Sequence, residues 1–268
     1  MTKRSLKNIH RLINFAVDQL PVDQMFVADL KTTIEKLDSK EARKPSQYYK
    51  PSSMLCLRNM YFQRVGQPIE DSGVSACLVG ICETGSSRHI HIQSYVDRMR
   101  EIGVDCEYID VGKYVEENKL EHLQIVGKKG METKLLHKDL NISFLCDGII
   151  KYHGEYYIFE FKTESTYKWT ARSAIADEHV PQGTAYSLCF NIDRVLFVYE
   201  NRDNCDKKAY LLNVTDDMKF DLIVSKIEEC DQFVSKLVVP PKSKETPRKA
   251  CEYCNYKIAC RRAGESGG

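Results

Sequence analysis

The stretch FLCDGIIKYHGEYYIFEFKT, residues 144–163, decides the fold. It consists of two apolar, β-branched and aromatic runs on either side of the dipeptide His153-Gly154. Runs of this composition are typical of strands, and a short turn containing glycine between two of them indicates a β-hairpin. We therefore predict two neighbouring antiparallel strands at the centre of the molecule.

Three charged residues lie inside this predicted hairpin. Strand alternation places Phe159 and Phe161 on one face of the second strand and Glu160 and Lys162 on the other. Charges in the middle of an apolar strand are costly unless something compensates them. The first strand supplies a candidate partner, because Asp147 is the only charged residue in FLCDGII. The hairpin would bring the two carboxylates onto neighbouring strands.

Glu-x-Lys alone is a weak pattern, and it occurs three times in the chain, at 117–119, 132–134 and 160–162. The first occurrence lies in a polar, helix-like segment, which is typical of a solvated face. The second lies in a charged region next to glycine that we expect to be a loop. Only the third lies within a strongly apolar strand, so we assign chemistry to that one alone.

Asp147, Glu160 and Lys162 together are compatible with two interpretations. Two close carboxylates repel each other, and a divalent cation with oxygen ligands relieves that repulsion. A neighbouring ammonium can then orient or help deprotonate a metal-bound water, or stabilise a charged transition state. The alternative is an ion pair at the edge of a sheet, and these three residues alone do not decide between the two.

The rest of the chain predicts an α/β fold. The expected helices cover 5–20, 25–37, 54–64, 86–101, 182–190 and 216–237. The expected strands cover 106–111, 122–126, 144–152, 155–162, 194–200 and 208–214. We expect one domain, 1–268, made of a helical N-terminal part (1–80), a core (81–215) and a C-terminal helix with a tail (216–268). The class is α/β, with a mixed central sheet flanked by helices.

Composition excludes several classes of protein. The chain has 268 residues and a net charge of +1, so any nucleic-acid binding must come from local patches. It contains neither an apolar run long enough for a membrane span nor a secretory signal. Eleven cysteines are an odd number for a disulfide framework. We expect an intracellular, cytoplasmic protein.

Two further pairs of residues flank the hairpin in the sequence. Gln182 and Tyr186 are four apart, so a helix places them on one face near its N-terminus, where a phosphate backbone can bind. A surface glutamine and a half-buried tyrosine would give the same pattern. Upstream, His89 follows Gly85 by four residues, and His91 is an alternative candidate. A single histidine on a helix is more often a core or capping residue than a ligand.

Three cysteines cluster in the tail as C-x-x-C-x5-C: Cys251, Cys254 and Cys260. A polar tail has no core of its own, and a metal is its natural organiser. Three thiolates leave a tetrahedral zinc site or an iron–sulfur cubane one ligand short. We choose Cys56 as the fourth, because it lies on an expected helix after a loop, away from the predicted sheet.

In order and spacing these motifs resemble the RecB-like PD-(D/E)XK nucleases, over about residues 80–200. The resemblance implies a restriction-endonuclease-like core. It implies a Mg²⁺ or Mn²⁺ site whose ligands are the side chains of His89, Asp147 and Glu160 and the carbonyl of Phe161. It also implies that Lys162 assists the attacking water, while Gln182 and Tyr186 position the substrate strand. Cys146 precedes the first acidic residue, whereas several members of the family have proline or glycine there.

The cysteine spacing resembles the iron–sulfur branch of that family, which includes the AddB-type nuclease domains and the CRISPR-associated RecB-like exonucleases. In that branch one cysteine lies far upstream and three lie at the C-terminus. The resemblance implies a [4Fe–4S] cluster on Cys56, Cys251, Cys254 and Cys260, clamping the two ends of the core. Structural zinc on the same thiolates is the competing interpretation. We expect the remaining cysteines to be buried or half-buried thiols: Cys77, Cys82, Cys106, Cys146, Cys189, Cys205 and Cys230.

Two basic and aromatic stretches are candidates for DNA contact. The candidate residues are Lys168, Trp169 and Arg172 near the predicted centre, and Arg248 and Lys249 in the tail. Either stretch could instead be ordinary solvated surface. The combination suits single-stranded or frayed-end DNA better than base-specific reading of a duplex.

The sequence therefore predicts a metal-dependent DNA nuclease, with an exonuclease favoured. Recombination, repair, phage DNA metabolism and CRISPR adaptation are compatible settings, with a helicase or a recombination or adaptation protein as partner. One alternative is a non-catalytic iron–sulfur or zinc protein that binds DNA or a partner on a nuclease scaffold. The other is a restriction-like endonuclease.

Overall fold

The computed structural model describes residues 21–40, 45–70, 75–243, 246, 251 and 254–265. The chain divides into two compact units, one of residues 1–43 and 71–83, the other of residues 44–70 and 84–268. The expected helix at 5–20 lies outside the described residues. In the first unit, α2 (Val22–Lys40) matches the expected second helix. Its Glu35 carboxylate accepts a hydrogen bond from the backbone N–H of Ala76, the first residue of α4 (Ala76–Asp97), at 3.0 Å.

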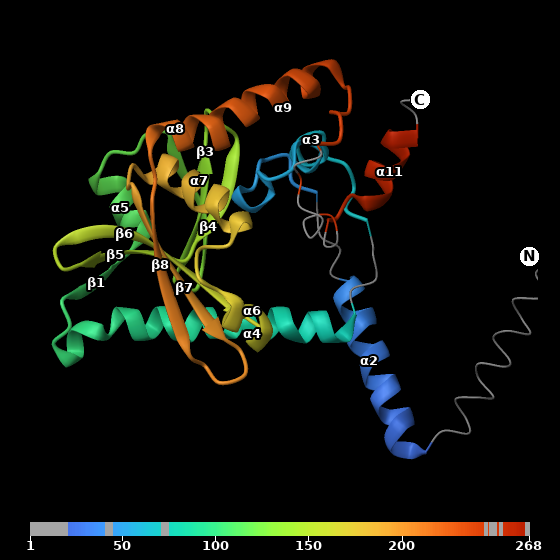
Figure 1. The fold of residues 1–268 in the computed structure, drawn as a ribbon, viewed down its shortest axis with the longest axis horizontal. Helices are drawn as coiled ribbons and strands as arrows, with labels where there is room; N and C mark the ends of the chain where they lie inside the picture. Colours follow the sequence, from blue (N-terminus) through green and yellow to red (C-terminus); the bar gives the residue numbers. More distant parts are fainter. Residues whose placement is uncertain are drawn as a thin grey trace, which may run out of the picture. The chain divides into compact units, whose positions relative to one another are not determined.

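A five-stranded mixed sheet forms the centre of the second unit (Figure 1). Its order is β1 (Cys106–Ile109), β5 (Gly148–Tyr152), β6 (Glu155–Glu164), β7 (Arg194–Asn201) and β8 (Lys207–Asn213). Neighbouring strands are antiparallel except β6 and β7, which are parallel. Helices cover both faces. The predicted α/β class, with a mixed central sheet flanked by helices, is confirmed.

A separate three-stranded antiparallel sheet contains β2 (Leu123–Lys129), β3 (Glu132–His137) and β4 (Ile142–Cys146). Two expectations were wrong here. We expected one strand over 144–152, but the chain changes sheets at Asp147, between β4 and β5. We expected a loop where β3 runs, because its sequence ETKLLH is charged at the start. Pairing with a strand on each side stabilises it instead.

The predicted hairpin is confirmed as β5–β6. Its turn is the dipeptide His153-Gly154, whose φ angles of 49° and 82° are both left-handed. Two left-handed residues match the twist of a two-residue hairpin. The register pairs Tyr152 with Glu155 and Gly148 with Phe159. Asp147 therefore stands at the open end of the hairpin, beside the middle of β6.

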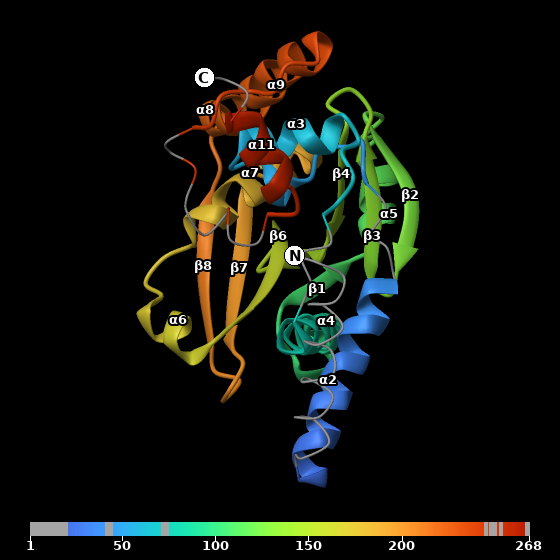
Figure 2. The same ribbon diagram turned by 90° about the vertical axis from the view of Figure 1, so that its right-hand side faces the viewer.

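The two faces of β6 are covered by different helices. Phe159 and Phe161 pack against Ile92 of α4. Ile158, on the other face, joins the main core together with α7 (Val180–Phe190). Since β6 and β7 are parallel, the chain has to cross over between them, and α7 is part of that crossover (Figure 2). The polar face of β6 therefore looks toward α7.

The remaining elements surround these sheets. They are η1 (Pro51–Ser53), α3 (Leu57–Arg64), η2 (Met99–Ile102), α5 (Val111–Glu117), α6 (Thr166–Ala171), η3 (Asp177–His179), α8 (Asp216–Lys219), η4 (Phe220–Val224), α9 (Ser225–Lys236) and α11 (Lys257–Glu265). The expected helix at 216–237 is thus α8 and α9 joined by the π-helical turn η4. Within the described ranges, none of the helices combines the length and apolar character that crossing a bilayer requires.

Candidate functional site

Asp147 occupies the junction between the two sheets and is fixed from several directions. Its side chain is buried, and Oδ2 accepts a hydrogen bond from the backbone N–H of Phe161 at 2.8 Å. Its backbone carbonyl accepts hydrogen bonds from Gln93 Nε2 at 2.6 Å and from the Tyr108 hydroxyl at 2.7 Å. The carboxylate of Asp147 is thus bonded to β6, and its backbone carbonyl to α4 and β1.

Glycine is required at the next position. A Cβ atom on Gly148 would lie 2.5 Å from a ring carbon of Tyr108 and 2.8 Å from its hydroxyl. The Tyr108 ring is also the group that reaches the Asp147 carbonyl. A side chain on Gly148 would push that ring away, so the Asp-Gly pair belongs to the construction of the site.

Glu160 is almost completely buried, with an exposed fraction of 2%. Its Oε1 accepts hydrogen bonds from Lys162 Nζ at 2.6 Å and from Gln182 Nε2 at 2.8 Å. Gln182 Nε2 also lies 2.9 Å from the Tyr186 hydroxyl, which donates to the Leu145 carbonyl at 3.0 Å. Glu160 Oε2 is buried and has no hydrogen-bond partner among the described residues. One oxygen is thus fixed, and the other is left for a ligand.

Nearby charges shift the pKa values of both Glu160 and Lys162. Burial and the nearby charge of Asp147 raise the pKa of Glu160 to about 7. Burial lowers the pKa of Lys162, but the charges of Glu160 and Asp147 outweigh it, so the pKa of Lys162 is raised. Lys162 is therefore an ammonium ion at neutral pH. Asp147, Glu160 and Lys162 therefore form one group of interacting charges.

His89, on α4, contacts Asp147 of the Asp147–Glu160 pair. Its Nδ1 lies 3.1 Å from Asp147 Oδ2, and its ring meets that of Phe161 edge-on at 5.1 Å between centroids. Burial lowers the pKa of His89, but the hydrogen bond to Asp147 and the charges of Asp147 and Glu160 raise it more. His91 is exposed, with Nδ1 2.8 Å from the Ser87 carbonyl. Of the two histidines, His89 faces the site.

An ion pair that sequence patterns did not reveal holds α4 in place. Arg88 donates from Nε and Nη2 to the two carboxylate oxygens of Glu200, both at 2.7 Å. Glu200 lies on β7 with an exposed fraction of 1%, and Lys207 Nζ lies 3.0 Å from it. A buried carboxylate paired in this way fixes the helix to the sheet one residue before His89.

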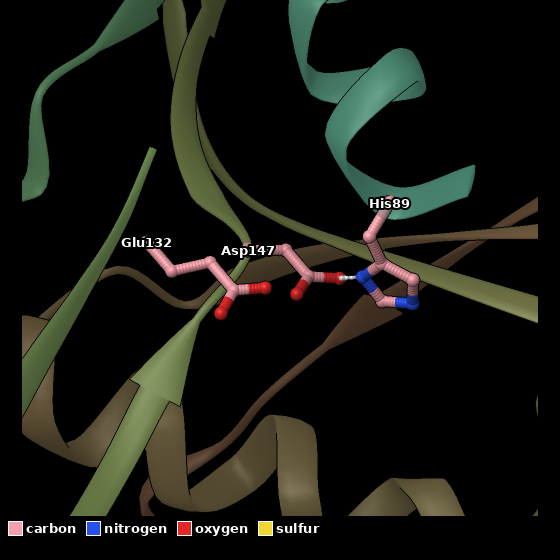
Figure 3. A group of neighbouring side chains, drawn as sticks. All are labelled: His89, Glu132 and Asp147. Atoms are coloured by element: carbon pink, nitrogen blue, oxygen red, sulfur yellow. Dashed lines mark ion pairs between the residues drawn. The ribbon is translucent and has the colours of Figure 1, made fainter. Parts of the chain in front are cut away.

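Glu132 is the functional candidate that the sequence reasoning rejected. One ligand atom each from Glu132, His89 and Asp147 lie within 4.8 Å of one another (Figure 3). We had assigned the 132–134 motif to a loop. It belongs to β3 instead, whose register pairs Thr133 with Cys146 and so places Glu132 beside the junction residue Asp147. Cross-strand pairing of this kind leaves no signature in the local sequence.

The four cysteines chosen from the sequence line one pocket of about 340 Å³. They are Cys56 at the N-cap of α3, Cys251 and Cys254, and Cys260 on α11. Burial raises the pKa of Cys254, and the other three thiols add to that shift. Arg58 donates to the carbonyl of Cys260 at 2.9 Å and lies 3.4 Å from its sulfur. The structure therefore brings this predicted group together.

No three of these four sulfurs lie within 4.8 Å of one another. Among the described residues, the group of His89, Glu132 and Asp147, called the Glu132 group below, is the only one that places three metal-binding atoms within 4.8 Å of one another. A zinc ion with Zn–S bonds of about 2.3 Å would hold its four sulfurs about 4 Å apart. In this structure, no three of the four thiols are as close as a zinc tetrahedron would need.

The remaining cysteines divide into two groups. Those at positions 106, 146, 189 and 230 are buried, as expected. Those at positions 77, 82 and 205 are exposed, so the expectation of buried or half-buried thiols was wrong for them. Cys205 lies in the connection between β7 and β8, with a φ of 63°.

The residues proposed for DNA contact differ in their exposure and in whether their side chains already have partners. Lys168 is exposed on α6. Trp169 is half-buried, with Lys208 Nζ 4.2 Å from the centre of its ring. Arg172 binds both carboxylate oxygens of Glu164, at 2.6 and 2.5 Å, so its guanidinium is already engaged. Arg248 and Lys249 lie outside the described residues.

Comparisons with known proteins give low similarity. No family model matches the sequence, and neither does any curated protein. Among solved structures, SSO0001 has 14% identity and a TM-score of 0.47, over 89% of this chain and 97% of the other. The alkaline exonuclease LHK-Exo from Laribacter hongkongensis has 13% identity and a TM-score of 0.40, over 81% and 96%. LHK-Exo in complex with dAMP has 14% identity and a TM-score of 0.41, over 80% and 95%. At this level, function has to be inferred from the side chains of the site.

Proposed function

We propose that the protein is a metal-dependent nuclease that hydrolyses phosphodiester bonds in DNA. One observation carries the proposal: Glu160 is buried beside Asp147 and Lys162 with one carboxylate oxygen fixed and the other without a partner. A buried carboxylate oxygen normally has a hydrogen bond or a metal. The ion-pair alternative accounts for Oε1 and leaves Oε2 unexplained.

The donor set fits Mg²⁺ or Mn²⁺. Two carboxylates and an imidazole are suitable ligands, and hard divalent cations prefer oxygen. His89, Asp147 and Glu160 would hold the ion together with the Phe161 carbonyl, the ligand that the family resemblance implies. When bound, the ion lowers the pKa of a water molecule and places a positive charge next to a phosphate oxygen.

The protein groups around it have separate tasks. Lys162, held as an ammonium by Glu160, places a positive charge where the phosphate becomes more negative during the reaction. Gln182 and Tyr186 are both buried, and their polar ends turn toward Glu160 and the Leu145 carbonyl. We therefore assign to them the positioning of Glu160, in place of the direct contact with the substrate strand that we expected.

For the substrate we propose single-stranded or frayed-end DNA, digested from an end. Helix α6 directly follows β6, the strand that carries Glu160 and Lys162. On α6, Tyr167 has an exposed fraction of 86% and is followed by the exposed Lys168. An aromatic ring next to a cation can stack a base and contact a phosphate. A helicase or recombination protein would supply such ends.

The cysteine pocket supports a second metal centre. We propose a [4Fe–4S] cluster on Cys56, Cys251, Cys254 and Cys260, because the thiols line one pocket and are spread wider than a zinc tetrahedron. The cluster would join α3 to α11 and the tail. Anaerobically purified protein is expected to contain iron and inorganic sulfide and to absorb broadly in the visible. Stoichiometric zinc without iron would overturn the assignment.

Nuclease activity is tested with single strands labelled at the 5′ or 3′ end, in Mg²⁺ or Mn²⁺. We expect release of nucleotides from an end and no cutting of covalently closed circles. Asp147→Ala and Lys162→Ala should each abolish release. Lys134→Ala is the matched control, because Lys134 is the exposed lysine of the second Glu-x-Lys motif. Activity in both Asp147→Ala and Lys162→Ala would refute the mechanism, and cutting of circles would replace the exonuclease by an endonuclease.

A further inference from the structure

We propose that Glu132 is a third carboxylate ligand of the catalytic cation, supplied by the three-stranded sheet. This inference rests on the proposed function and names a ligand beyond the four that the sequence resemblance implies. It adds a residue from β3, an element that carries none of the other candidate ligands.

The position of Glu132 is the first support. Its carboxylate points toward that of Asp147, on the side away from His89 (Figure 3). One ligand atom from each of these three residues lies within 4.8 Å of the others, so a single cation can contact all three with small side-chain movements. Asp147 is buried, while Glu132 and His89 are half-buried. The group therefore has an open side from which a hydrated ion can enter.

Glu160 provides the second, independent support. Its side chain has an exposed fraction of 3%, and Oε2 has no hydrogen-bond partner among the described residues. The Asp147 carboxylate accepts a hydrogen bond from the backbone N–H of Phe161 at 2.8 Å, so it lies beside β6 next to the position of Glu160. A buried acceptor without a donor points to a ligand that carries positive charge. The Glu132 group and the unpartnered oxygen thus share Asp147 as their common neighbour.

The backbone keeps Glu132 in this position. Strand β3 is paired on both sides, with Thr133 opposite Cys146 on β4 and Lys128 on β2. Because Cys146 directly precedes Asp147, the first residue of β3 is held beside the junction between the sheets. The affinity of an oxygen site for a divalent cation rises with the number of charged ligands. A third carboxylate would therefore tighten binding relative to the Asp147–Glu160 pair.

The test measures binding of Mn²⁺ to the intact protein in the absence of DNA. The paramagnetic resonance signal of free Mn²⁺ falls when the ion binds. Glu132→Gln keeps the size of the side chain and removes its charge. The matched control is Glu117→Gln, at the exposed glutamate of the first Glu-x-Lys motif. Asp147→Asn defines any binding of Mn²⁺ elsewhere, including the cysteine pocket.

We expect Glu132→Gln to weaken Mn²⁺ binding at least about tenfold, and Glu117→Gln to leave it unchanged. The Mn²⁺ concentration for half-maximal cleavage should rise in parallel. If Glu132→Gln, with an unchanged melting temperature in a chelator, binds Mn²⁺ like the wild type, the inference is wrong and the proposed function stands. If the wild type binds no more Mn²⁺ than Asp147→Asn, the proposed metal site itself fails.

Discussion

The carboxylate site and the cysteine pocket are assembled in opposite ways. Around Asp147 and Glu160, hydrogen bonds from side chains and backbone fix one oxygen of each carboxylate and the backbone carbonyl of Asp147. The cysteine pocket is formed by residues of α3 and α11 together with Lys242, Ser243, Thr246, Cys251 and Cys254. Arg58 of α3 contacts the carbonyls of Pro240 and Cys260. The first site is organised by the fold, whereas in the second we propose that a metal holds the parts together.

This contrast separates two uses of a metal. A site that the protein already holds can bind and release its ion without unfolding, which suits a catalytic cation. A site whose ligands the protein does not hold in place by itself converts metal binding into folding free energy. Variants in the two regions should therefore change different measured properties, such as cleavage rate or stability. Four experiments test whether the two regions act independently.

The largest effect is expected from Lys162→Ala. Loss of the ammonium next to Glu160 should lower the cleavage rate at least about a thousandfold. The iron or zinc content of the purified protein should not change. Single-turnover cleavage and metal analysis of the same preparation measure both. Loss of cysteine-bound metal in this variant would show that the two regions are not independent.

The next largest effect is expected from Cys254→Ser. Removing one thiolate should release the metal of the cysteine pocket and lower the free energy of unfolding by more than about 4 kcal/mol. Chemical denaturation gives that value, with Cys205→Ser as the control because Cys205 is exposed and distant from the pocket residues in the sequence. Equal stability of Cys254→Ser and Cys205→Ser would contradict a structural metal.

A smaller effect is expected from pH in the metal-free protein. The pKa of Glu160 is raised from 4.5 to about 7 by burial and by Asp147. The folded chain thus keeps a proton that the unfolded chain has lost, so this contribution is complete below pH 4.5 and disappears as the pH rises through 7. The loss should be on the order of 3 kcal/mol or less.

The pH effect is measured by denaturation in a chelator across this range. His89, whose pKa is also raised, adds a loss of the same sign. Burial lowers the pKa of His137 to about 4 and that of His179 to about 3, so these two residues add a gain of stability with rising pH. The contribution of Glu160 is therefore the difference between the wild type and Glu160→Gln, and this difference should shrink as the pH rises through 7. Parallel profiles of the two proteins would contradict the raised pKa of Glu160.

The smallest effect is expected from Tyr186→Phe. The change removes the hydroxyl that contacts Gln182 and donates to the Leu145 carbonyl. Leaving these groups unpaired should cost about 1–2 kcal/mol of stability. Cleavage should slow less than tenfold, because Glu160 keeps its bond to Lys162. A collapse of activity without loss of stability would show that Tyr186 contacts the substrate after all.

The part of the site that lies within one hairpin was predictable. The alternation of FEFK, the His153-Gly154 turn and the single charge in FLCDGII determine which residues face one another, because all are local in the sequence. Glu132 was missed because its position depends on how β3 pairs with β4. The pair of Arg88 and Glu200 was missed for the same reason, since it joins a helix to a distant strand.

The residue types in a segment were a weaker guide to its function than the contacts that its side chains make. The stretch TYKWTAR looked like a basic and aromatic surface, yet Arg172 is bound to Glu164 and Trp169 packs beneath Lys208. Nothing in the local sequence shows whether a cation already has a partner. The cysteines were predictable as a group because only their number and spacing were needed, and Cys56 was identified with the help of a family resemblance.

The distribution of the four cysteines also orders events during synthesis of the chain. The β5–β6 hairpin, with Asp147, Glu160 and Lys162, can pair soon after it leaves the ribosome, since its contacts are local. Cys56 by contrast emerges early and has no partner until the segment from Cys251 to Cys260 follows. The four-thiol pocket can therefore form only after the hairpin. Until then, the growing chain contains Asp147, Glu160 and Lys162 but lacks the four-cysteine pocket that connects α3 to α11.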